Sequence, residues 1–267
     1  MTQLIPPALR NRETRAIITG GTQGLGLAIA EELASEGAEA MVLAGRDPDK
    51  GAHAVRHMHD LGVSALFVAC DVARVEECWG LIDRGVAFLG TANALVNAAG
   101  ATDRGGLLDT TPELWAKLMD TNARGPFFLM QRFVAHARRL GHGGSIVNIL
   151  SMVIHCGQSY LAPYSASKAA LALLTKNVAT AHRRDHIRVN GIAVGWMDTP
   201  GEDAVQRQWH GAQDGWLEEA EAKQPFGQLV KPDEVAGLAA YLLSPASGVM
   251  TGAIIDHDQN VAGANPE

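Results

Sequence analysis

Short apolar segments rich in β-branched residues alternate along this chain with longer segments whose apolar residues recur at helical spacing. This alternation is typical of repeated strand–helix units, whose strands pair in one parallel sheet with helices on both faces. The expected strands are almost continuously apolar, which indicates that both of their faces are buried. They lie at residues 15–19, 40–44, 65–70, 94–97, 145–150, 188–193 and 252–255.

The other periodic segments predict helices at about residues 25–36, 48–61, 74–88, 111–139, 163–183 and 232–243. The whole pattern predicts a single doubly wound α/β domain with a seven-stranded parallel sheet over residues 14–267, preceded by an N-terminal extension, residues 1–13. Residues 196–227 interrupt the alternation, because they are rich in charge, Gln and Trp and contain no strand pattern. We interpret this segment, which we call the lid, as a substrate-binding insertion, with a disordered loop as the alternative.

Composition excludes several classes of partner. The net charge is −7, so the chain has no basic surplus to attract nucleic acid or anionic lipid. It also contains no run of about 18 uncharged apolar residues, the length needed to span a membrane. The three cysteines, Cys70, Cys78 and Cys156, suit neither a disulfide framework nor a metal site, and the polar, proline-containing N-terminus lacks a signal-peptide pattern. His53 and His57 are one helical turn apart, but no acidic or cysteine ligand is placed to complete a metal site. We therefore expect a cytoplasmic protein with no metal, nucleic-acid or membrane partner.

A glycine-rich turn follows the first expected strand and reads T-G-G-T-Q-G-L-G over residues 19–26. Glycines let the backbone approach a pyrophosphate closely, and the free N–H groups and dipole of the next helix supply positive potential. The general G-x-G-x-x-G/A dinucleotide spacing is not met, because Ile29 stands at its third position, and a simple tight turn is the alternative. The place after the first strand favours a dinucleotide site. Its predicted contacts are Gly20, Thr22, Gln23, Gly24, Leu25 and Gly26.

The end of the second expected strand carries the signal for the choice between NADP and NAD. An acidic residue there binds the ribose 2′-hydroxyl of NAD, whereas an arginine accommodates the 2′-phosphate of NADP. Gly45 occupies the place of the acid and Arg46 follows it, which favours NADP. NAD remains the alternative, because Asp47 is close enough to compete and Gln23 brings no second positive charge.

A tyrosine, a lysine and a serine stand at spacings that suit proton transfer. Tyr164 and Lys168 are four residues apart, on one face of an expected helix, and Ser151 follows the fifth expected strand. A phenol has a pKa near 10, and a neighbouring ammonium group would stabilise the phenolate and lower that pKa. Ser151 would hydrogen-bond the substrate oxygen, and no G-x-S-x-G pattern marks it as a nucleophile.

Together these residues resemble the short-chain dehydrogenase/reductase family over nearly the whole chain. The matches include its T-G-x3-G-x-G turn, its N-x-A-G segment at residues 97–100 and its S-x12-Y-x3-K core. The resemblance implies a Rossmann domain that transfers hydride between a nicotinamide cofactor and a secondary alcohol or ketone, with Tyr164 as the acid/base. Further roles that it implies are adenine contacts for Asp71 and Val72, cofactor contacts for Asn97, Ala98 and Ala99, a tetrad role for Asn122, and nicotinamide-side contacts for Gly195, Met197 and Thr199.

Two segments depart from the family pattern. Val194 and Gly195 stand where the family usually has Pro-Gly, so we expect a looser loop that keeps its cofactor contact. Residues 256–260, Asp-His-Asp-Gln-Asn, stand where relatives often have Asp-Gly-Gly, which would alter subunit contacts or the far wall of the pocket. Residues 107–139 and 163–183 resemble the helices that pair in family oligomers, so we expect a homotetramer or homodimer.

The resemblance assigns the substrate pocket to segments after the serine, before the tyrosine and within the lid. Its expected lining residues are Val153, His155, Gln158 and Trp196, and less directly Trp209 and His210. Polar groups between indole walls suit a sugar, polyol or hydroxy acid, although His155 and Gln158 could simply satisfy backbone groups. The alternatives are a reductase of carrier-bound 3-oxoacyl groups or other carbonyls, and a non-enzymatic dinucleotide sensor or scaffold. The presence of all four tetrad residues argues against the sensor.

Overall fold

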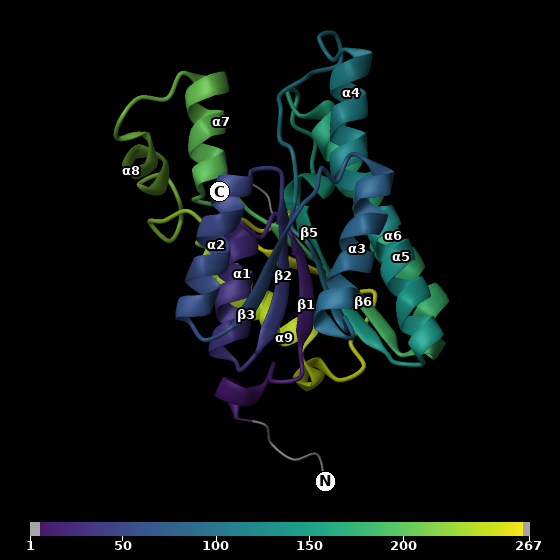
Figure 1. The fold of residues 1–267 in the computed structure, drawn as a ribbon. Helices are drawn as coiled ribbons and strands as arrows, with labels where there is room; N and C mark the ends of the chain where they lie inside the picture. The colour runs from purple at the N-terminus through teal and green to yellow at the C-terminus, as the bar shows by residue number, and fades with distance from the viewer. Residues whose placement is uncertain (1–5, 264–267) are drawn as a thin grey trace.

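The computed structural model describes residues 6–263 and confirms a single sheet between two layers of helices (Figure 1). All neighbouring strands are parallel, in the order β3-β2-β1-β4-β5-β6-β7. The strands are β1 Arg15–Thr19, β2 Ala40–Gly45, β3 Ser64–Ala69, β4 Ala94–Asn97, β5 Gly144–Ser151, β6 Ile187–Val194 and β7 Ile254–His257. The strand order reverses between β1 and β4, and such a reversal opens a ligand crevice at the carboxyl ends of the strands.

Helices cover both faces of the sheet, as the apolar strands predict. One layer contains α1 Gly24–Ser35, α2 Pro48–Asp60 and α9 Pro232–Leu243, and the other contains α3 Val75–Leu89, α5 Gly125–Leu140 and α6 Ala162–His182. Each layer forms its own hydrophobic cluster with the strand side chains that face it. Full burial of one Leu or Ile side chain stabilises the fold by about 1.5–3 kcal/mol relative to its exposure to water. Short 3-10 helices are η1 Pro7–Leu9, η3 Met152–Ile154, η4 Arg183–Asp185 and η5 Pro245–Ser247.

The helix expected at 111–139 is confirmed in its extent, since helical structure runs without interruption over residues 112–140, and it contains a π turn that the sequence did not predict. Helix α4, Pro112–Met119, is followed by the π-helical turn η2, Asp120–Arg124, and then by α5. Pro126 has no N–H for a regular helical bond, and a Cβ on Gly125 would lie only 2.2 Å from the carbonyl oxygen of Val72. The wider π turn accommodates this contact, and π turns are frequent at functional sites.

The lid contains two helices, α7 Pro200–His210 and α8 Trp216–Glu221, rather than the disordered loop that was the alternative. Both stand above the carboxyl ends of the strands, across from α4 (Figure 1). Val230 forms backbone hydrogen bonds to the first residues of the lid. Its N–H donates to the carbonyl of Trp196, and its carbonyl accepts from the N–H of Asp198, each at 3.0 Å. The segment therefore leaves the domain and returns to it at nearly the same point.

The first described residues pack against the domain. Asn11 is completely buried, and its Nδ2 donates to the carbonyl of Ala240 in α9 at 3.1 Å and to Glu36 at 2.5 Å. Of the predicted extension, residues 1–5 lie outside the described residues, and the boundary at residue 13 stays a prediction. Within residues 6–263, no helix is both long and apolar enough to cross a membrane.

Candidate active site

The glycine turn lies against the segment that follows β4. Thr19 Oγ1 accepts hydrogen bonds from the N–H groups of Ala98 and Ala99, both at 3.2 Å. Gly20 has a φ of +66°, and a Cβ there would lie 2.9 Å from the nitrogen of Ala99. No side chain fits at this position, so the backbone of the turn stays exposed toward the carboxyl edge of the sheet.

The same turn forms a cradle at the start of α1. A Cβ on Gly26 would lie 2.2 Å from the carbonyl oxygen of Gly20, and Gly24 has a φ of +53°. A Cβ on Gly24 would lie 3.7 Å from Thr199, which caps α7 by accepting from Glu202 N, so the starts of α1 and α7 lie side by side. Backbone N–H groups at helix starts suit a pyrophosphate.

A buried polar atom beneath this cradle supports the same interpretation. Asn97 Nδ2 donates to Asn148 Oδ1 at 2.7 Å, but the buried Asn97 Oδ1 has no hydrogen-bond partner among the described residues. Buried polar atoms are rarely left unpaired without a functional reason. The cradle and this free acceptor fit a dinucleotide cofactor.

The adenosine end of the predicted cofactor site contains a cavity of about 260 Å³. Its lining residues are Arg46, Ala69, Cys70, Asp71, Arg74 and Glu77. Two of the predicted contacts, Arg46 and Asp71, are thus brought together. Val72 is buried just beyond them and contacts the start of α5 through its carbonyl oxygen.

Asp47, the expected competitor of Arg46, is engaged elsewhere. Its Oδ1 accepts from the N–H groups of Asp49 at 2.9 Å and Lys50 at 3.1 Å, which makes it the N-cap of α2. The Lys50 ammonium in turn donates to Gln23 Oε1 at 2.5 Å and brings a second positive charge to the glycine turn. Lys50 was not among the contacts predicted from the sequence. An Asp directly before a Pro is typical of a helix N-cap, and this pattern could have indicated that Lys50 lies in the first turn of α2.

The predicted catalytic residues come together at the ends of β5 and α6. Lys168 is buried, and its Nζ donates to the carbonyl of Ile149 at 2.8 Å and lies 5.9 Å from the centre of the Tyr164 ring. Ser151 ends β5, and its side chain lies close enough to the buried Tyr164 to lower the pKa of the phenol. The helical spacing of Tyr164 and Lys168 therefore does place both on one face of α6, toward the serine.

Asn122 completes this group from the π turn η2. Its Oδ1 accepts from Ala101 N and its Nδ2 donates to Ala101 O, each at 2.9 Å, while Nδ2 also donates to Ser167 Oγ at 3.0 Å. A Cβ on Gly100 would lie 3.4 Å from Asn122 Oδ1 and 3.6 Å from Lys168 Nζ, so both side chains border the same backbone position. The asparagine joins the segment after β4 to α6.

Burial controls the protonation of the tyrosine and the lysine. It raises the pKa of Tyr164, against the hydrogen bond of Ser151 and the charge of Arg104, which lower it, while the charge of Glu202 raises it further. The predicted net lowering of the Tyr164 pKa is therefore wrong for the chain alone, because burial outweighs the groups that lower it. Burial also lowers the pKa of Lys168 to about 8, so its ammonium group loses a proton far more readily than an exposed lysine.

The residues expected to line the substrate pocket take different positions. Val153 is buried and packs with Tyr164 in a small apolar cluster, whereas Gln158 is exposed. His155 Nε2 lies 2.8 Å from Asp256 Oδ1, which joins this segment to β7. Trp196 Nε1 donates to Glu202 Oε1 at 2.8 Å within the lid.

The C-terminal segment that departs from the family pattern contacts the end of the lid. Gln259 Oε1 accepts from the N–H of Phe226 at 2.9 Å, and its Nε2 donates to the carbonyl of Gln228 at 2.7 Å. Asp258 also approaches Gly195 so closely that a Cβ there would lie 2.2 Å from its Oδ1. The departure therefore supplies side chains that fasten the lid to the sheet edge.

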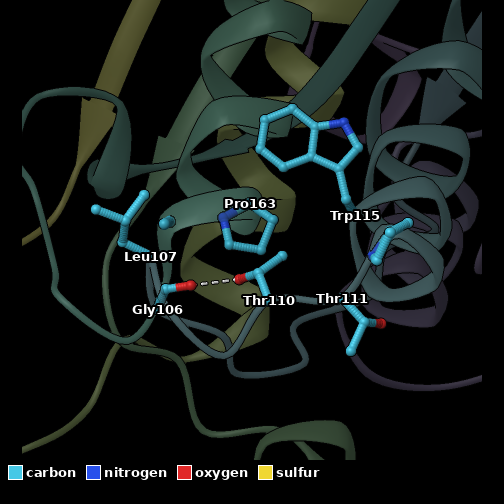
Figure 2. A pocket seen from close by; sticks show the side chains of 8 residues that line it. Gly106, Leu107, Thr110, Thr111, Trp115 and Pro163 are labelled. Carbon is cyan, nitrogen blue, oxygen red and sulfur yellow. Dashed lines mark hydrogen bonds between the residues drawn. The ribbon is translucent and has the colours of Figure 1, made fainter.

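A second cavity, of about 310 Å³, lies beside the start of α6 (Figure 2). Its lining residues are Gly106, Leu107, Thr110, Thr111, Pro112, Trp115, Ala162 and Pro163. Thr110 Oγ1 donates to the carbonyl of Gly106 at 2.5 Å and closes the turn below it. None of the predicted catalytic side chains lines this cavity, so it lies outside the chemical centre.

Comparisons with known proteins agree with this geometry. A family model described as enoyl-(acyl carrier protein) reductase matches residues 20–260. The NADP-dependent (R)-specific alcohol dehydrogenase of Lentilactobacillus kefiri is 33% identical over 89% of this chain and 92% of its own length. The cis-4-hydroxycyclohexanecarboxylate dehydrogenase of Sinomonas cyclohexanicum is also 33% identical, over 92% of this chain and 95% of its own.

The solved structures include a variant of actinorhodin polyketide ketoreductase with NADPH. It superposes with a TM-score of 0.84 and 31% identity, over 91% of this chain and 95% of that one. The similarity thus extends over nearly the whole chain and includes both the glycine turn and the residues around Tyr164.

Proposed function

The chain belongs to the short-chain dehydrogenase/reductase family and is an NAD(P)-dependent oxidoreductase, and we propose that it interconverts a secondary alcohol and its ketone with Tyr164 as the acid/base. The observation that carries this proposal is the buried group of Ser151, Tyr164, Lys168 and Asn122 at the carboxyl edge of the sheet, next to the glycine turn. Because the chain is an oxidoreductase by family, the alternative of a non-enzymatic sensor or scaffold is not supported.

The nicotinamide, when bound, supplies or accepts the hydride. Ser151 and Tyr164 lie side by side, so both hydroxyls can contact one substrate oxygen. In reduction Tyr164 gives its proton to that oxygen, and in oxidation it takes the proton away. Lys168 stabilises the resulting phenolate while it keeps its own proton, and Asn122 holds the segment after β4 in position.

Replacement of Tyr164 by Phe tests the proposed chemistry. We expect turnover to fall by at least about 100-fold, because general acid/base catalysis contributes about 10²–10⁴-fold. The affinity for NADP should change little, as measured by calorimetry. A Tyr160→Phe variant is the matched control, since Tyr160 is exposed and stands four residues before Tyr164, ahead of the start of α6. Retained turnover in Tyr164→Phe would refute the assignment.

We propose NADP as the preferred cofactor. Arg46 lines the cavity at the adenosine end, Lys50 adds a second cation at the glycine turn, and the carboxylate of Asp47 is occupied as a helix cap. This arrangement suits a 2′-phosphate better than a free ribose hydroxyl. The NADP-dependent relative and the NADPH-bound neighbour support the same choice.

For the substrate we propose a sugar, polyol or hydroxy acid, with carrier-bound 3-oxoacyl compounds as the rival class. The lid supports a polar substrate, because Glu202 pairs with Trp196 and Gln206 through Oε1 only and its Oε2 has no donor among the described residues. The relative that acts on a hydroxycyclohexanecarboxylate supports the first class, and the ketoreductase neighbour supports the rival. Turnover of polyols and hydroxy acids against acyl thioesters separates the two.

We also propose that the protein works in the cytoplasm as a homotetramer or homodimer. All three cysteines are free thiols in the structure, which suits a reducing compartment. Apolar side chains remain exposed on α4 and α6, among them Trp115 and Leu173. A partner subunit on these helices would cover them.

A further inference from the structure

Two oppositely charged side chains that the sequence motifs did not single out belong to the segments that stand on either side of the catalytic helix α6 and the glycine turn. They are Arg104, between β4 and α4, and Glu202, in the first turn of α7. Helix α7 begins beside the glycine turn at Thr199 and reaches Arg104 through His210, and the charges of Arg104 and Glu202 shift the pKa of Tyr164 in opposite directions. They form no ion pair with each other in the described part of the chain.

The backbone holds Arg104 close to the catalytic helix. The next residue, Gly105, pairs with Leu161 as a parallel bridge. Its N–H donates to the carbonyl of Tyr160 at 2.8 Å, and its own carbonyl accepts from Ala162 N at 3.0 Å. Because α6 begins at Ala162, this pairing fixes the position of Arg104 relative to the start of the helix that carries Tyr164.

The guanidinium of Arg104 is oriented by neutral groups from three segments. Its Nη1 donates to the carbonyl of Thr102 at 2.7 Å, its Nε donates to His210 Nε2 at 3.2 Å, and its Cζ lies 5.8 Å from the centre of the Tyr160 ring. His210 belongs to the lid, so the arginine bridges the lid and the body of the domain. These contacts fix the charge in place without neutralising it.

No carboxylate lies within ion-pair distance of Arg104 among residues 6–263. Other arginines of the chain do have such partners, for example Arg132 with Asp83 at 2.8 Å. Nη2 of Arg104 has no hydrogen-bond partner in the described structure, so the planar fork keeps donors for a further group. A half-buried guanidinium with free donors is suited to bind a carboxylate in two-point geometry.

Glu202 presents a complementary acceptor on the lid side. Its Oε1 accepts from Trp196 Nε1 at 2.8 Å and from Gln206 Nε2 at 2.7 Å, whereas no described donor contacts its Oε2. Hydroxyl groups donate readily to such a carboxylate oxygen.

We propose that the substrate is a polyhydroxylated carboxylic acid, whose carboxylate binds Arg104 and whose hydroxyl groups donate to Glu202 while its reacting carbon faces Tyr164. This inference rests on the proposed oxidoreductase function and narrows its substrate class. A neutral polyol would leave the free donors of the half-buried arginine to water, and a simple hydroxy acid without further hydroxyls would leave the free oxygen of the half-buried glutamate to water. Charge-assisted hydrogen bonds are stronger than neutral ones, so a compound that makes both contacts is favoured.

Matched compounds test the charge requirement directly. We would measure kcat/KM for gluconate and for glucitol, which share a carbon chain and differ in the carboxylate, with NADP and with NAD. The wild-type enzyme should prefer the acid. Arg104→Gln should lower the ratio of kcat/KM for gluconate to kcat/KM for glucitol by about 10- to 100-fold, the loss expected for a charge-assisted pair of about 1.5–3 kcal/mol, because the ratio cancels the effect of the arginine charge on Tyr164. Arg104→Lys should recover part of the loss.

Further variants separate a specific role from a general loss of structure. Arg184→Gln, an exposed arginine in η4, should leave both compounds unaffected. Glu202→Gln keeps an acceptor for Trp196 and should lower kcat/KM for gluconate more than kcat/KM for 3-hydroxybutyrate, which has no additional hydroxyls. Equal losses for gluconate and glucitol in Arg104→Gln would mean that the arginine only fastens the lid, and would overturn the inference.

Calorimetry with gluconate in the presence of NADP gives a readout that does not require turnover. We expect binding to the wild-type protein and none to Arg104→Gln. If the enzyme turns over neutral alcohols or ketones but neither binds nor prefers gluconate and other sugar acids, the inference fails while the oxidoreductase function stands. Unchanged turnover in Tyr164→Phe would instead contradict the proposed function.

Discussion

At the scale of single residues, burial decides what the tyrosine and the lysine can do. The grouping of Ser151, Tyr164 and Lys168 could be predicted from the sequence, because the spacing of Tyr164 and Lys168 depends on local helical geometry. The position of Arg104 near the start of α6 could not be predicted, because it depends on the pairing of Gly105 with Leu161, which are far apart in the chain. The capping role of Asp47 could have been predicted from its local pattern, but that pattern was not interpreted as a cap.

Lys168 makes stability depend on pH in a defined direction. Its pKa is lowered by burial to about 8, whereas an unfolded lysine has a value near 10.4. Below about pH 8 both states carry the proton, and burial of the charge opposes folding by an amount on the order of 3 kcal/mol. Between about pH 8 and 10.4 the folded state has lost the proton that the unfolded state keeps, so stability rises with pH in this range.

We therefore expect the wild-type protein to gain stability relative to Lys168→Met between about pH 7 and about pH 10. Urea unfolding of both proteins at the two pH values measures this difference, and the comparison cancels groups that titrate in both. A difference that stays constant with pH would show that the lysine is not destabilised by its burial.

Arg46 and Lys50 should act on one cofactor only. We expect Arg46→Gln to raise KM for NADP by about 10- to 100-fold and Lys50→Gln by about three- to tenfold, because charge-assisted contacts to a phosphate are lost. KM for NAD should remain within about twofold in both. Arg56→Gln is the control, since Arg56 lies on the same helix and contacts His53. Parallel losses for NADP and NAD would argue against a 2′-phosphate contact.

At the scale of elements, the π turn inside the expected helix 111–139 is the main feature that the sequence did not predict. Apolar periodicity continues through this turn, so it could not reveal the wider helical geometry. The turn ends at a tertiary contact, the approach of Gly125 to the carbonyl of Val72. The lid helices were missed for another reason, because α7 and α8 are short and polar and bury little apolar surface.

Gly125→Ala tests the importance of this contact. The new methyl group would meet a backbone carbonyl that has no side-chain freedom to move away, so we expect a loss of about 1–3 kcal/mol in the free energy of unfolding. Gly80→Ala is the matched control, since it also lies within a helix but has nothing within 4 Å of its Cβ position. That variant should be neutral or stabilised by up to about 1 kcal/mol in the same urea titration.

At the scale of the whole molecule, the sheet and its two helical layers followed from the sequence because the five central strands are almost continuously apolar and buried. Subunit assembly is the remaining question at this scale. Leu173 on α6 is 67% exposed, and Trp115 on the neighbouring helix α4 is 47% exposed. The family resemblance points to the same helices.

Leu173→Glu should therefore weaken the predicted oligomer and lower the molar mass in solution, measured by light scattering at several protein concentrations. A buried unpaired carboxylate at an interface is costly, whereas the same change on a free surface has little effect. Leu61→Glu, at the end of α2 and 50% exposed, serves as the control. An unchanged mass in both variants would place the interface elsewhere.

The closure of the lid at Val230 has a consequence for how enzymes of this kind diversify. Since the segment leaves and re-enters the domain at one backbone bridge, its length and composition can change without altering the register of any strand. Transplanting the stretch between Asp198 and Val230 from a relative should therefore yield a folded chimera with a new substrate preference. Evolution can exchange such a segment as a module while the hydride-transfer machinery below it stays constant.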